Sequence, residues 1–207
     1  GKTTLLKMVN GLVEPSGGTI EVEGVELTRR TLGKIRRNVS MIHQHFNLVP
    51  RLPVETNVLS GAAAVLPLWR LLLGVYPDPM RRKAAALTEQ VGLDEKQFRR
   101  RAARLSGGQQ QRVGIARAFI LDPAIVLADE PVASLDPKIS EEILAILRES
   151  AKDRGSTVLC SLHQLELARA FADRIIGMGD GKVVYDGPPA GLEPAVIDKI
   201  YRKERAP

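Results

Sequence analysis

The sequence contains little cysteine, histidine or aromatic residue, and each shortage excludes a class of protein. One cysteine among 207 residues cannot form an internal disulfide, and three histidines leave little material for a zinc site. Aromatic residues amount to 4% of the chain, so a nucleic-acid surface built from stacked rings lacks its platform. These shortages favour a protein without disulfides in a reducing compartment.

The remaining composition is that of an ordinary globular protein. Hydrophobic residues make up 44% and charged residues 26%, values that exclude a disordered or collagen-like chain. A length of 207 residues suits one domain, or one domain that carries a small subdomain. The sequence begins with Gly1, and no basic segment with an apolar stretch of the leader type follows it. We therefore expect a fragment whose true start lies upstream.

The net charge of +6 is concentrated in one short stretch. Residues 81–104 carry eight bases and three acids, whereas residues 105–207 carry thirteen bases and fifteen acids. Because no aromatic residues are interleaved with these bases, a solvated helix face is favoured over a nucleic-acid footprint. Attraction to an anionic membrane surface is a further alternative.

Apolar periodicity predicts alternating helices and strands at both ends of the chain, with helices alone between them. Helical spacing follows Lys2 and ends at Gly11, and further helices are predicted at 113–120 and 138–152. Apolar runs at 124–128 and 157–162 are typical of parallel strands buried on both faces. Shorter strands are predicted at 19–23, 25–27 and 39–42, and a hairpin at 174–186.

Residues 58–76 are nearly all apolar and about as long as a membrane-spanning helix. Pro67 and Arg70 interrupt the segment, and both are costly in a helix that crosses hydrocarbon. We therefore expect a buried helical subdomain here. An apolar docking surface for a partner is the alternative.

Gly1-Lys2-Thr3 opens the first predicted helix and has the residues of a phosphate-binding loop. Glycine lets backbone amides approach phosphate oxygens, lysine neutralises the β- and γ-phosphates, and the threonine hydroxyl can bind Mg²⁺. The N-terminus of the helix favours the same anion. The tripeptide alone is a weak motif, and a solvated lysine at a helix start is the simpler interpretation.

Asp129 and Glu130 follow five apolar residues, at the end of a predicted buried strand. The carboxyl ends of parallel strands are where open α/β sheets bind ligands. Asp129 is a candidate to hold Mg²⁺ through water, and Glu130 is a candidate to orient or deprotonate an attacking water. An acidic strand end that merely caps the following turn is the alternative.

Leu105-Ser106-Gly107-Gly108-Gln109 is the most specific string in the sequence. Ser106 and Gln109 are spaced as a capping box, and the two glycines leave the backbone amides of a helix start exposed. We interpret this segment as an anion-binding helix start. A well-capped helix without a ligand is the alternative.

Two further candidates follow predicted strands. His163 comes after the strand at 157–162 and is expected at the same sheet edge as Asp129, although a lone histidine there is more often structural. Gln44 lies between two histidines after the strand at 39–42. We assign the functional role to Gln44, because neither a cysteine nor an acid accompanies the histidines as a metal ligand.

Taken in order along the chain, these motifs resemble the ATP-binding subunits of ABC transporters, and the resemblance covers essentially the whole sequence. Its elements are the end of Walker A at Gly1-Lys2-Thr3-Thr4, the Q-loop glutamine Gln44, the signature motif at 105–109, Walker B with its catalytic glutamate at 125–130, the D-loop at Ser134-Leu135-Asp136 and the switch histidine His163. The implied fold is α/β: a P-loop NTPase core of mainly parallel sheet, with an antiparallel β part and an inserted α-helical subdomain.

The resemblance implies three successive parts. Residues 1–45 would form the first, truncated part of the RecA-like ATP-binding core, and residues 46–112 the helical signature subdomain. Residues 113–207 would form the second part of the core, with a C-terminal hairpin and helix. The front of Walker A and an aromatic residue against adenine would precede Gly1, so we expect the chain alone to bind ATP poorly.

The family's residue roles carry over to the matching positions. The resemblance implies that Lys2 neutralises phosphate charge, Glu130 polarises the attacking water and His163 contacts the γ-phosphate. Mg²⁺ would be bound by Thr3, by Gln44 and, through water, by Asp129. The residues implied to contact ATP are Gly1, Lys2, Thr3, Thr4, Gln44, Asp129 and Asp136, together with Ser106, Gly107, Gly108 and Gln109 of a second copy.

The resemblance also implies partners and a location. Two copies would pair head to tail as a homodimer, and integral membrane permease subunits would connect them to a periplasmic or surface substrate-binding protein. The chain would then be a peripheral ATP hydrolase on the cytoplasmic face of the bacterial inner membrane. No nucleic-acid partner is expected.

Three segments bear on the cargo. Residues 43–49, 131–137 and 161–164 resemble bacterial phosphonate-import ATP-binding subunits, whereas importers of polar amino acids and of methionine share part of the pattern. A soluble ABC-type ATPase that acts on nucleic acid or ribosomes is the alternative of another class, but it would carry a long insertion, a second cassette or a coiled coil. Glu130 and His163 argue against a regulatory module without hydrolysis.

Overall fold

Three parallel strands form the centre of the molecule, which is described here from a computed structural model over residues 1–201. The strands are β3 (Val39–Ile42), β4 (Ile125–Asp129) and β5 (Thr157–Ser161), in the order β3-β4-β5. Ile42 pairs with Ala128, and Asp129 pairs with Ser161. The carboxyl ends of all three strands therefore meet at one edge of the sheet.

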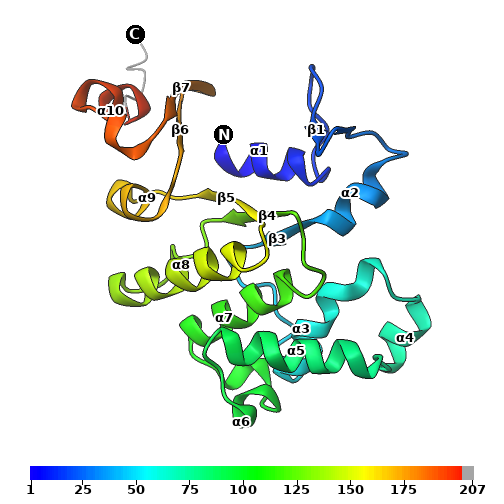
Figure 1. Ribbon diagram of the computed structural model, residues 1–207. Coiled ribbons are helices and arrows are strands. Elements are labelled where there is room, and N and C mark those ends of the chain that lie inside the picture. The colour runs from blue at the N-terminus through cyan, green and yellow to red at the C-terminus, as the bar shows by residue number, and fades with distance from the viewer. Residues whose placement is uncertain (202–207) are drawn as a thin grey trace.

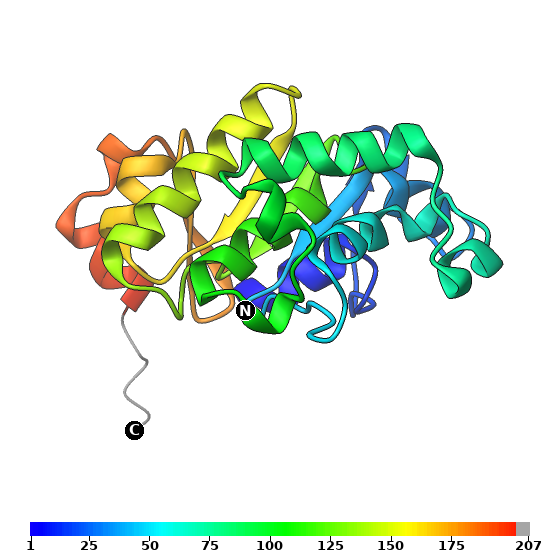
Figure 2. The ribbon, with the colours of Figure 1, turned by 90° about the horizontal axis from the view of Figure 1, so that it is seen from below.

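Helices cover both faces of this sheet, as the apolar runs of its strands require. The helices α1 (Lys2–Val9) and α2 (Leu32–Asn38) pack on one face, where Leu6, Ile35 and Leu127 form a small core. The helices α7 (Gly107–Ala118) and α8 (Pro137–Lys152) lie on the other face. Figure 2 shows the green α7 and the yellow-green α8 in front of the strands. The predicted α/β class is confirmed.

Two antiparallel pairs flank the parallel sheet. The pair β1 (Glu21–Val22) and β2 (Val25–Glu26) is shorter than the predicted strands, because only two residue pairs form the ladder around the Glu23-Gly24 turn. The hairpin of β6 (Ile175–Gly179) and β7 (Lys182–Gly187) turns at Asp180-Gly181 as predicted, and Gly181 has a φ of +78°. The remaining elements there are α9 (Leu165–Phe171), η3 (Pro189–Gly191) and α10 (Pro194–Tyr201).

A group of helices connects β3 to α7 and lies below the sheet in Figure 1. Its elements are α3 (Val54–Leu59), η1 (Ser60–Ala64), α4 (Leu68–Leu73), α5 (Asp78–Gln90), α6 (Glu95–Phe98) and η2 (Ala102–Arg104). The helix expected at 113–120 begins earlier, at Gly107, so the predicted boundary at residue 112 falls within α7. One large core runs through this group and the parallel sheet, with Val54, Leu87 and Val126 among its buried members.

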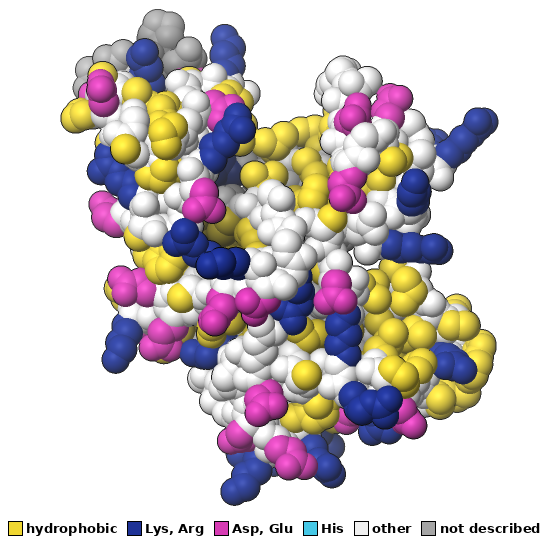
Figure 3. Space-filling model, viewed as in Figure 1, with side chains coloured by type: hydrophobic (Ala, Val, Ile, Leu, Met, Phe, Trp, Pro, Cys, Tyr) yellow, Lys and Arg dark blue, Asp and Glu magenta, His cyan; other side chains and the backbone are white. Residues whose placement is uncertain are grey.

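The apolar segment at 58–76 is buried only in its first part. Val58, Leu59 and Ala62 are at most 1% exposed, whereas most apolar side chains from Val65 to Val75 are exposed (Figure 3). The expectation of a wholly buried segment is therefore wrong for α4, which packs against the rest of the molecule through few residues. Among residues 1–201, no helix combines the length and the hydropathy that a bilayer crossing requires.

The basic stretch at 81–104 forms an exposed, partly paired surface. Arg81 pairs with Glu55 at 2.8 Å, and Arg99 pairs with Glu95 at 3.2 Å. Most of the other bases point into solvent, as the interpretation of a solvated helix face predicts.

Replacing Phe119 with alanine should lower the free energy of unfolding by about 3–5 kcal/mol, because the ring lies in the core shared by the sheet and the helices. The ring is 0% exposed, and the Arg154 guanidinium lies 5.3 Å from its centroid. Urea denaturation followed by circular dichroism measures the change. The control is Val183→Ala on β7, where the side chain is 58% exposed. An equally small change in both variants would contradict the shared core.

Candidate functional site

A buried carboxylate stands at the centre of the sheet edge. Asp129 is the last residue of β4 and is 7% exposed. Its Oδ1 accepts hydrogen bonds from Thr3 Oγ1 and from Ser161 Oγ, each at 2.9 Å. Among residues 1–201, Oδ2 accepts no hydrogen bond, so one carboxylate oxygen keeps its capacity for a further donor. The first turn of α1, the end of β4 and the end of β5 meet at this group.

The segment Gly1-Lys2-Thr3-Thr4 forms the start of α1 at the same edge. Gly1 is the exposed residue before the helix, and its carbonyl accepts from the amide of Leu5 at 3.0 Å. Lys2 and Thr3 are half-buried, and Thr4 is exposed. The backbone amides of the first turn have no intrahelical partner, so this end of α1 is suited to an anion.

Glu130 and His163 form a pair beside Asp129. His163 Nε2 lies 2.5 Å from Glu130 Oε1, and the side chains of histidine and glutamate are 63% and 15% exposed. Glu130 has a left-handed backbone with a φ of +49°, and its amide donates to the carbonyl of Ser161 at 3.2 Å and to Ser161 Oγ at 3.0 Å. A left-handed conformation is uncommon for glutamate and costs of order 1 kcal/mol or more. Ser161 therefore holds the glutamate at the sheet edge in a conformation that the chain would otherwise avoid.

Gln44 lies two residues beyond the end of β3 and is half-buried. The loop that follows has two consecutive left-handed residues, Phe46 with a φ of +54° and Asn47 with a φ of +46°. Arg117 of α7 donates to the carbonyl of Asn47 at 2.6 Å and to the carbonyl of Phe46 at 2.8 Å. One guanidinium thus fixes the loop after Gln44 to the helix that begins at the 105–109 segment.

Arg117 is a residue that the sequence analysis missed. An arginine in the last turn of a helix is ordinarily a favourable partner of the helix dipole, so its position carries no signal. Burial lowers the pKa of Arg117 from its usual value. The pKa of His43 is lowered by burial and by the nearby Arg117 charge, which favours neutral imidazole next to Gln44.

The segment at 105–109 starts α7 with the predicted capping box. The Gln109 amide donates to Ser106 Oγ at 3.3 Å, and the Ser106 amide donates to Gln109 Oε1 at 3.0 Å. A Cβ on Gly108 would lie 2.8 Å from Ile139 Cγ2, so the close packing of α7 on α8 requires glycine there. A Cβ on Gly107 would lie 3.4 Å from Leu135, which brings the 134–136 segment to the start of α7.

Asp136 is the N-cap of α8. Its Oδ1 accepts from the amide of Ile139 at 3.1 Å, which satisfies one of the free donors of the helix start. The carboxylate of Asp136 is thus engaged within its own segment.

The candidate residues fall into two groups. Lys2, Thr3, Asp129, Glu130 and His163 meet at the ends of β4 and β5, with Gln44 beyond the neighbouring end of β3. Ser106, Gly107, Gly108 and Gln109 lie at the start of α7, next to the segment of Asp136. Within the described part of the chain, no hydrogen bond or ion pair joins the second group to the first.

Cys160 takes no part in this chemistry. It lies within β5, and burial, with the nearby Asp129 charge, raises the pKa of its thiol to about 12. The thiol therefore stays protonated at neutral pH and is inert, as predicted.

The comparisons with known proteins agree with this geometry. The family model described as ABC transporter matches residues 1–133. A phosphonates import ATP-binding protein of Hyphomonas neptunium is 53% identical over 93% of this chain and 74% of its own length. A protein of the same name from Hydrogenovibrio crunogenus is 49% identical over 99% of this chain and 75% of its own length.

Solved structures show the same fold. A dimeric bacterial ABC transporter cassette is 32% identical, with a TM-score of 0.77 over 93% of this chain and 82% of its own. A dimeric cassette in a post-hydrolysis state bound to ADP and Pi is 36% identical, with a TM-score of 0.74 over the same shares. In sequence and in fold, this chain belongs to the ABC transporter family.

Proposed function

We propose that this chain is the ATP-binding and ATP-hydrolysing subunit that energises an ABC importer, with phosphonates as the cargo. The observation that carries the proposal is the sheet edge itself. A helix start with a lysine, a buried aspartate and a glutamate–histidine pair lie together at this edge. This arrangement supports binding of a nucleoside triphosphate and activation of an attacking water. The ABC ATPase family to which the chain belongs binds ATP.

The start of α1 would bind the phosphates of ATP. Gly1 leaves room for the backbone, the amides at the helix start donate to phosphate oxygens, and Lys2 neutralises their charge. Thr4 and Asp136 are proposed as further contacts. Phosphoryl transfer requires mainly positioning of the phosphates and stabilisation of their negative charge, and these groups supply both.

The residues present also fit Mg²⁺. Thr3 Oγ1, a side-chain oxygen of Gln44 and the Asp129 carboxylate are oxygen donors, which this ion prefers. Thr3 and Asp129 already lie within one hydrogen bond of each other. The ion, when bound, neutralises charge on the β- and γ-phosphates, and Asp129 would hold it through water at the free Oδ2.

Glu130 would polarise the attacking water, and His163 would contact the γ-phosphate. In the single chain His163 Nε2 lies 2.5 Å from Glu130 Oε1, so the two side chains are engaged with each other. Binding of ATP would give His163 a phosphate partner and would free the glutamate oxygen for water. Without nucleotide, the glutamate oxygen is thus engaged with His163 and not with water.

A second copy would complete the site. The start of α7, formed by Ser106, Gly107, Gly108 and Gln109, is suited to an anion. Within residues 1–201, no hydrogen bond or ion pair joins it to the first group. We propose that two chains pair head to tail, so that each ATP lies between one chain's α1 start and the other's α7 start. The two solved relatives described above are dimers.

The remaining partners follow from the transport role. Integral membrane permease subunits would bind the homodimer, and a periplasmic or surface substrate-binding protein would deliver the cargo to them. The chain would then be peripheral to the cytoplasmic face of the inner membrane. Residues 1–45, 46–112 and 113–207 are proposed as the first part of the ATP-binding core, the helical signature subdomain and the second part of the core.

The cargo is supported by the names of the relatives. Proteins 45–53% identical over more than nine-tenths of this chain are named phosphonates import ATP-binding proteins. The alternative cargoes are polar amino acids and methionine. Because the ATPase does not contact the cargo, the cargo can be identified only by an assay of the assembled transporter.

ATP hydrolysis by the full-length transporter in liposomes should rise when phosphonate-loaded binding protein is added. Turnover is measured as phosphate release, with binding protein loaded with an amino acid as the control. Stimulation by an amino acid and not by a phosphonate would refute the cargo and leave the ATPase role intact. Absence of ATP hydrolysis under every condition would refute the ATPase role.

Glu130→Gln in the full-length protein should abolish most ATP turnover and leave ATP binding intact, because glutamine keeps the shape of the side chain and loses the basic oxygen. We expect a fall of about 10²-fold or more, the range for removal of a positioned general base. Nucleotide affinity by calorimetry checks that binding persists. Undiminished turnover would show that the proposed role of Glu130 is wrong.

Arg117→Gln should impair the coupling of Gln44 to α7 without removing any group that contacts ATP. Loss of two charge-assisted hydrogen bonds frees the left-handed Phe46-Asn47 turn. We expect KM for ATP to change by less than about threefold while kcat falls by about tenfold, the pattern of an interaction made mainly in the transition state. Arg117→Lys, which keeps the charge and loses the fork, should recover only part of kcat.

A further inference from the structure

The C-terminal helix α10 packs closely on strand β6 (Figure 1). A Cβ on Gly177 would lie 2.6 Å from Ile200 Cδ1, and a Cβ on Gly179 would collide with the carbonyl oxygen of Lys199. Glycine within a strand often marks such a close approach of another segment. The two glycines therefore let α10 lie directly on the hairpin, and this contact fixes where the end of the helix lies.

The same hairpin lies against the proposed phosphate-binding segment. A Cβ on Gly1 would lie 3.3 Å from Met178 Cε, so a side chain of β6 approaches the start of α1. Arg169 of α9 donates to the carbonyl of Leu192, which lies just before α10 and is buried. The hairpin, α9 and α10 are thus held against the sheet edge that carries the candidate site.

One hydrogen bond joins α10 to the candidate site. Tyr201, the last residue of α10, donates from Oη to the carbonyl oxygen of His163 at 3.1 Å, across 38 positions of the chain. Within residues 1–201, this is the only hydrogen bond that the backbone of His163 makes. The tyrosine hydroxyl is therefore the polar group that holds the histidine backbone in place.

Packing does little to hold His163. Its side chain is 63% exposed, and a small cavity of about 20 Å³ is lined by His163, Glu130 and Leu167. On its other side the imidazole is engaged by the Glu130 carboxylate. Binding of ATP, as proposed above, would release the glutamate oxygen to water. The bond from Tyr201 would then remain as the restraint on this segment.

The surroundings of Tyr201 indicate a polar role and not a packing role. Its side chain is 56% exposed, and none of the residues 194–201 is buried. An exposed hydroxyl can bond to water when its protein partner is removed, so the bond adds little to the free energy of unfolding. Since α10 is already fixed by its contacts with the glycines of β6, the bond matters more to His163 than to the fold.

We propose that Tyr201 is a positioning residue for ATP hydrolysis. Its hydroxyl fixes the backbone of His163, and this places the imidazole to contact the γ-phosphate in the transition state. The inference rests on the proposed function, because it concerns the same site. It adds to that site a residue from the C-terminal helix, which acts through the histidine.

The variant Tyr201→Phe in the full-length protein removes the hydroxyl and keeps the ring. In the reconstituted transporter we expect kcat to fall by about fivefold, the effect of one lost net hydrogen bond. KM for ATP should change by less than about twofold, because the interaction is made mainly in the transition state. The unfolding midpoint of the isolated subunit, followed by circular dichroism, should change by less than about 2 °C.

The matched control is Tyr185→Phe. Tyr185 lies on β7 of the same hairpin, and its Oη donates to the carbonyl of Pro188, so this variant loses the same kind of bond. It should leave kcat and KM at their wild-type values. An undiminished kcat for Tyr201→Phe, or an equal fall in both variants, would overturn the proposal.

The NMR signal of the His163 ring is a readout that a change in stability alone would not move. The full-length subunit is isotopically labelled at histidine and studied without nucleotide, and the signal that His163→Gln removes is assigned to this ring. Tyr201→Phe should shift or broaden the signal, and Tyr185→Phe should leave it unchanged. A His163 signal that does not respond to Tyr201→Phe would overturn the proposal.

The positioning role and the proposed function can fail separately. A wild-type transporter that does not hydrolyse ATP would refute the proposed function, whereas a ring signal that responds to Tyr201→Phe would still support the contact with His163. Normal wild-type hydrolysis that Tyr201→Phe leaves unchanged would overturn the positioning role alone. A raised KM with an unchanged kcat would assign the tyrosine to nucleotide binding and would also overturn that role.

Discussion

The hydrogen bonds to Asp129 are the constraint on which the candidate site depends. A carboxylate that is 7% exposed would be costly without donors, and Thr3 and Ser161 provide two at 2.9 Å. Thr3 belongs to α1 on one face of the sheet, and Ser161 ends the neighbouring strand. The bonds therefore fix the start of α1, the proposed phosphate-binding segment, against two strand ends. Ser161 Oγ also accepts from the amide of Glu130, so the same hydroxyl orients both Asp129 and Glu130.

Helix α7 joins the 105–109 segment to the loop that follows Gln44. Its N-terminus carries the capping box at Ser106, and near its C-terminus Arg117 holds the turn after Gln44. Twelve residues span about 18 Å, and the helix is packed along its length in the large core. The loop after Gln44 and the start of α7 are thus joined to one packed helix.

The sequence predicted the strand ends well and the contacts between loops poorly. The apolar runs before Asp129 and His163 specify buried parallel strands, and parallel strands bring their carboxyl ends to one edge, so the meeting of these residues follows from local pattern. The bond of Arg117 to the Phe46-Asn47 turn joins residues about seventy positions apart, and no local pattern encodes it. The outward turn of α4 was only the alternative to a buried subdomain, because an apolar run carries no mark that separates burial in the chain's own core from burial against a partner.

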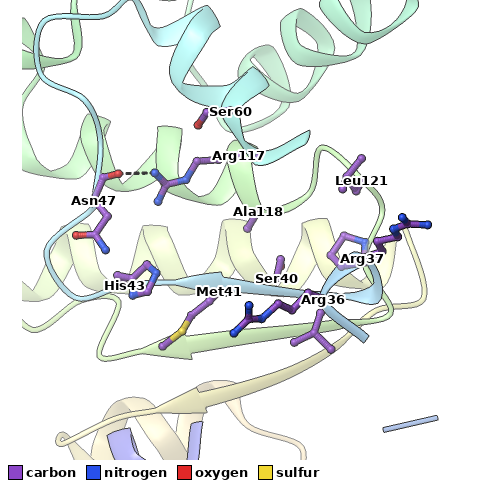
Figure 4. Close-up of a pocket in the computed structure, with 13 residues that line it drawn as sticks. Arg36, Arg37, Ser40, Met41, His43, Asn47, Ser60, Arg117, Ala118 and Leu121 are labelled. Atoms are coloured by element: carbon purple, nitrogen blue, oxygen red, sulfur yellow. Dashed lines mark hydrogen bonds between the residues drawn. The ribbon is translucent and has the colours of Figure 1, made fainter. Parts of the chain in front are cut away.

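The position of the positive charge matters more than its total. The basic stretch at 81–104 supplies most of the excess charge, yet its side chains are solvated or paired on an exposed surface. Arg36, Arg37 and Arg117 lie outside that stretch and add little to the sum. They line a cavity of about 320 Å³ (Figure 4), and none of its lining residues within the described part of the chain is acidic. Coulomb interactions strengthen as water is excluded, so the charge of the half-buried Arg117 acts on neighbouring groups more strongly than the charges of the exposed Arg36 and Arg37.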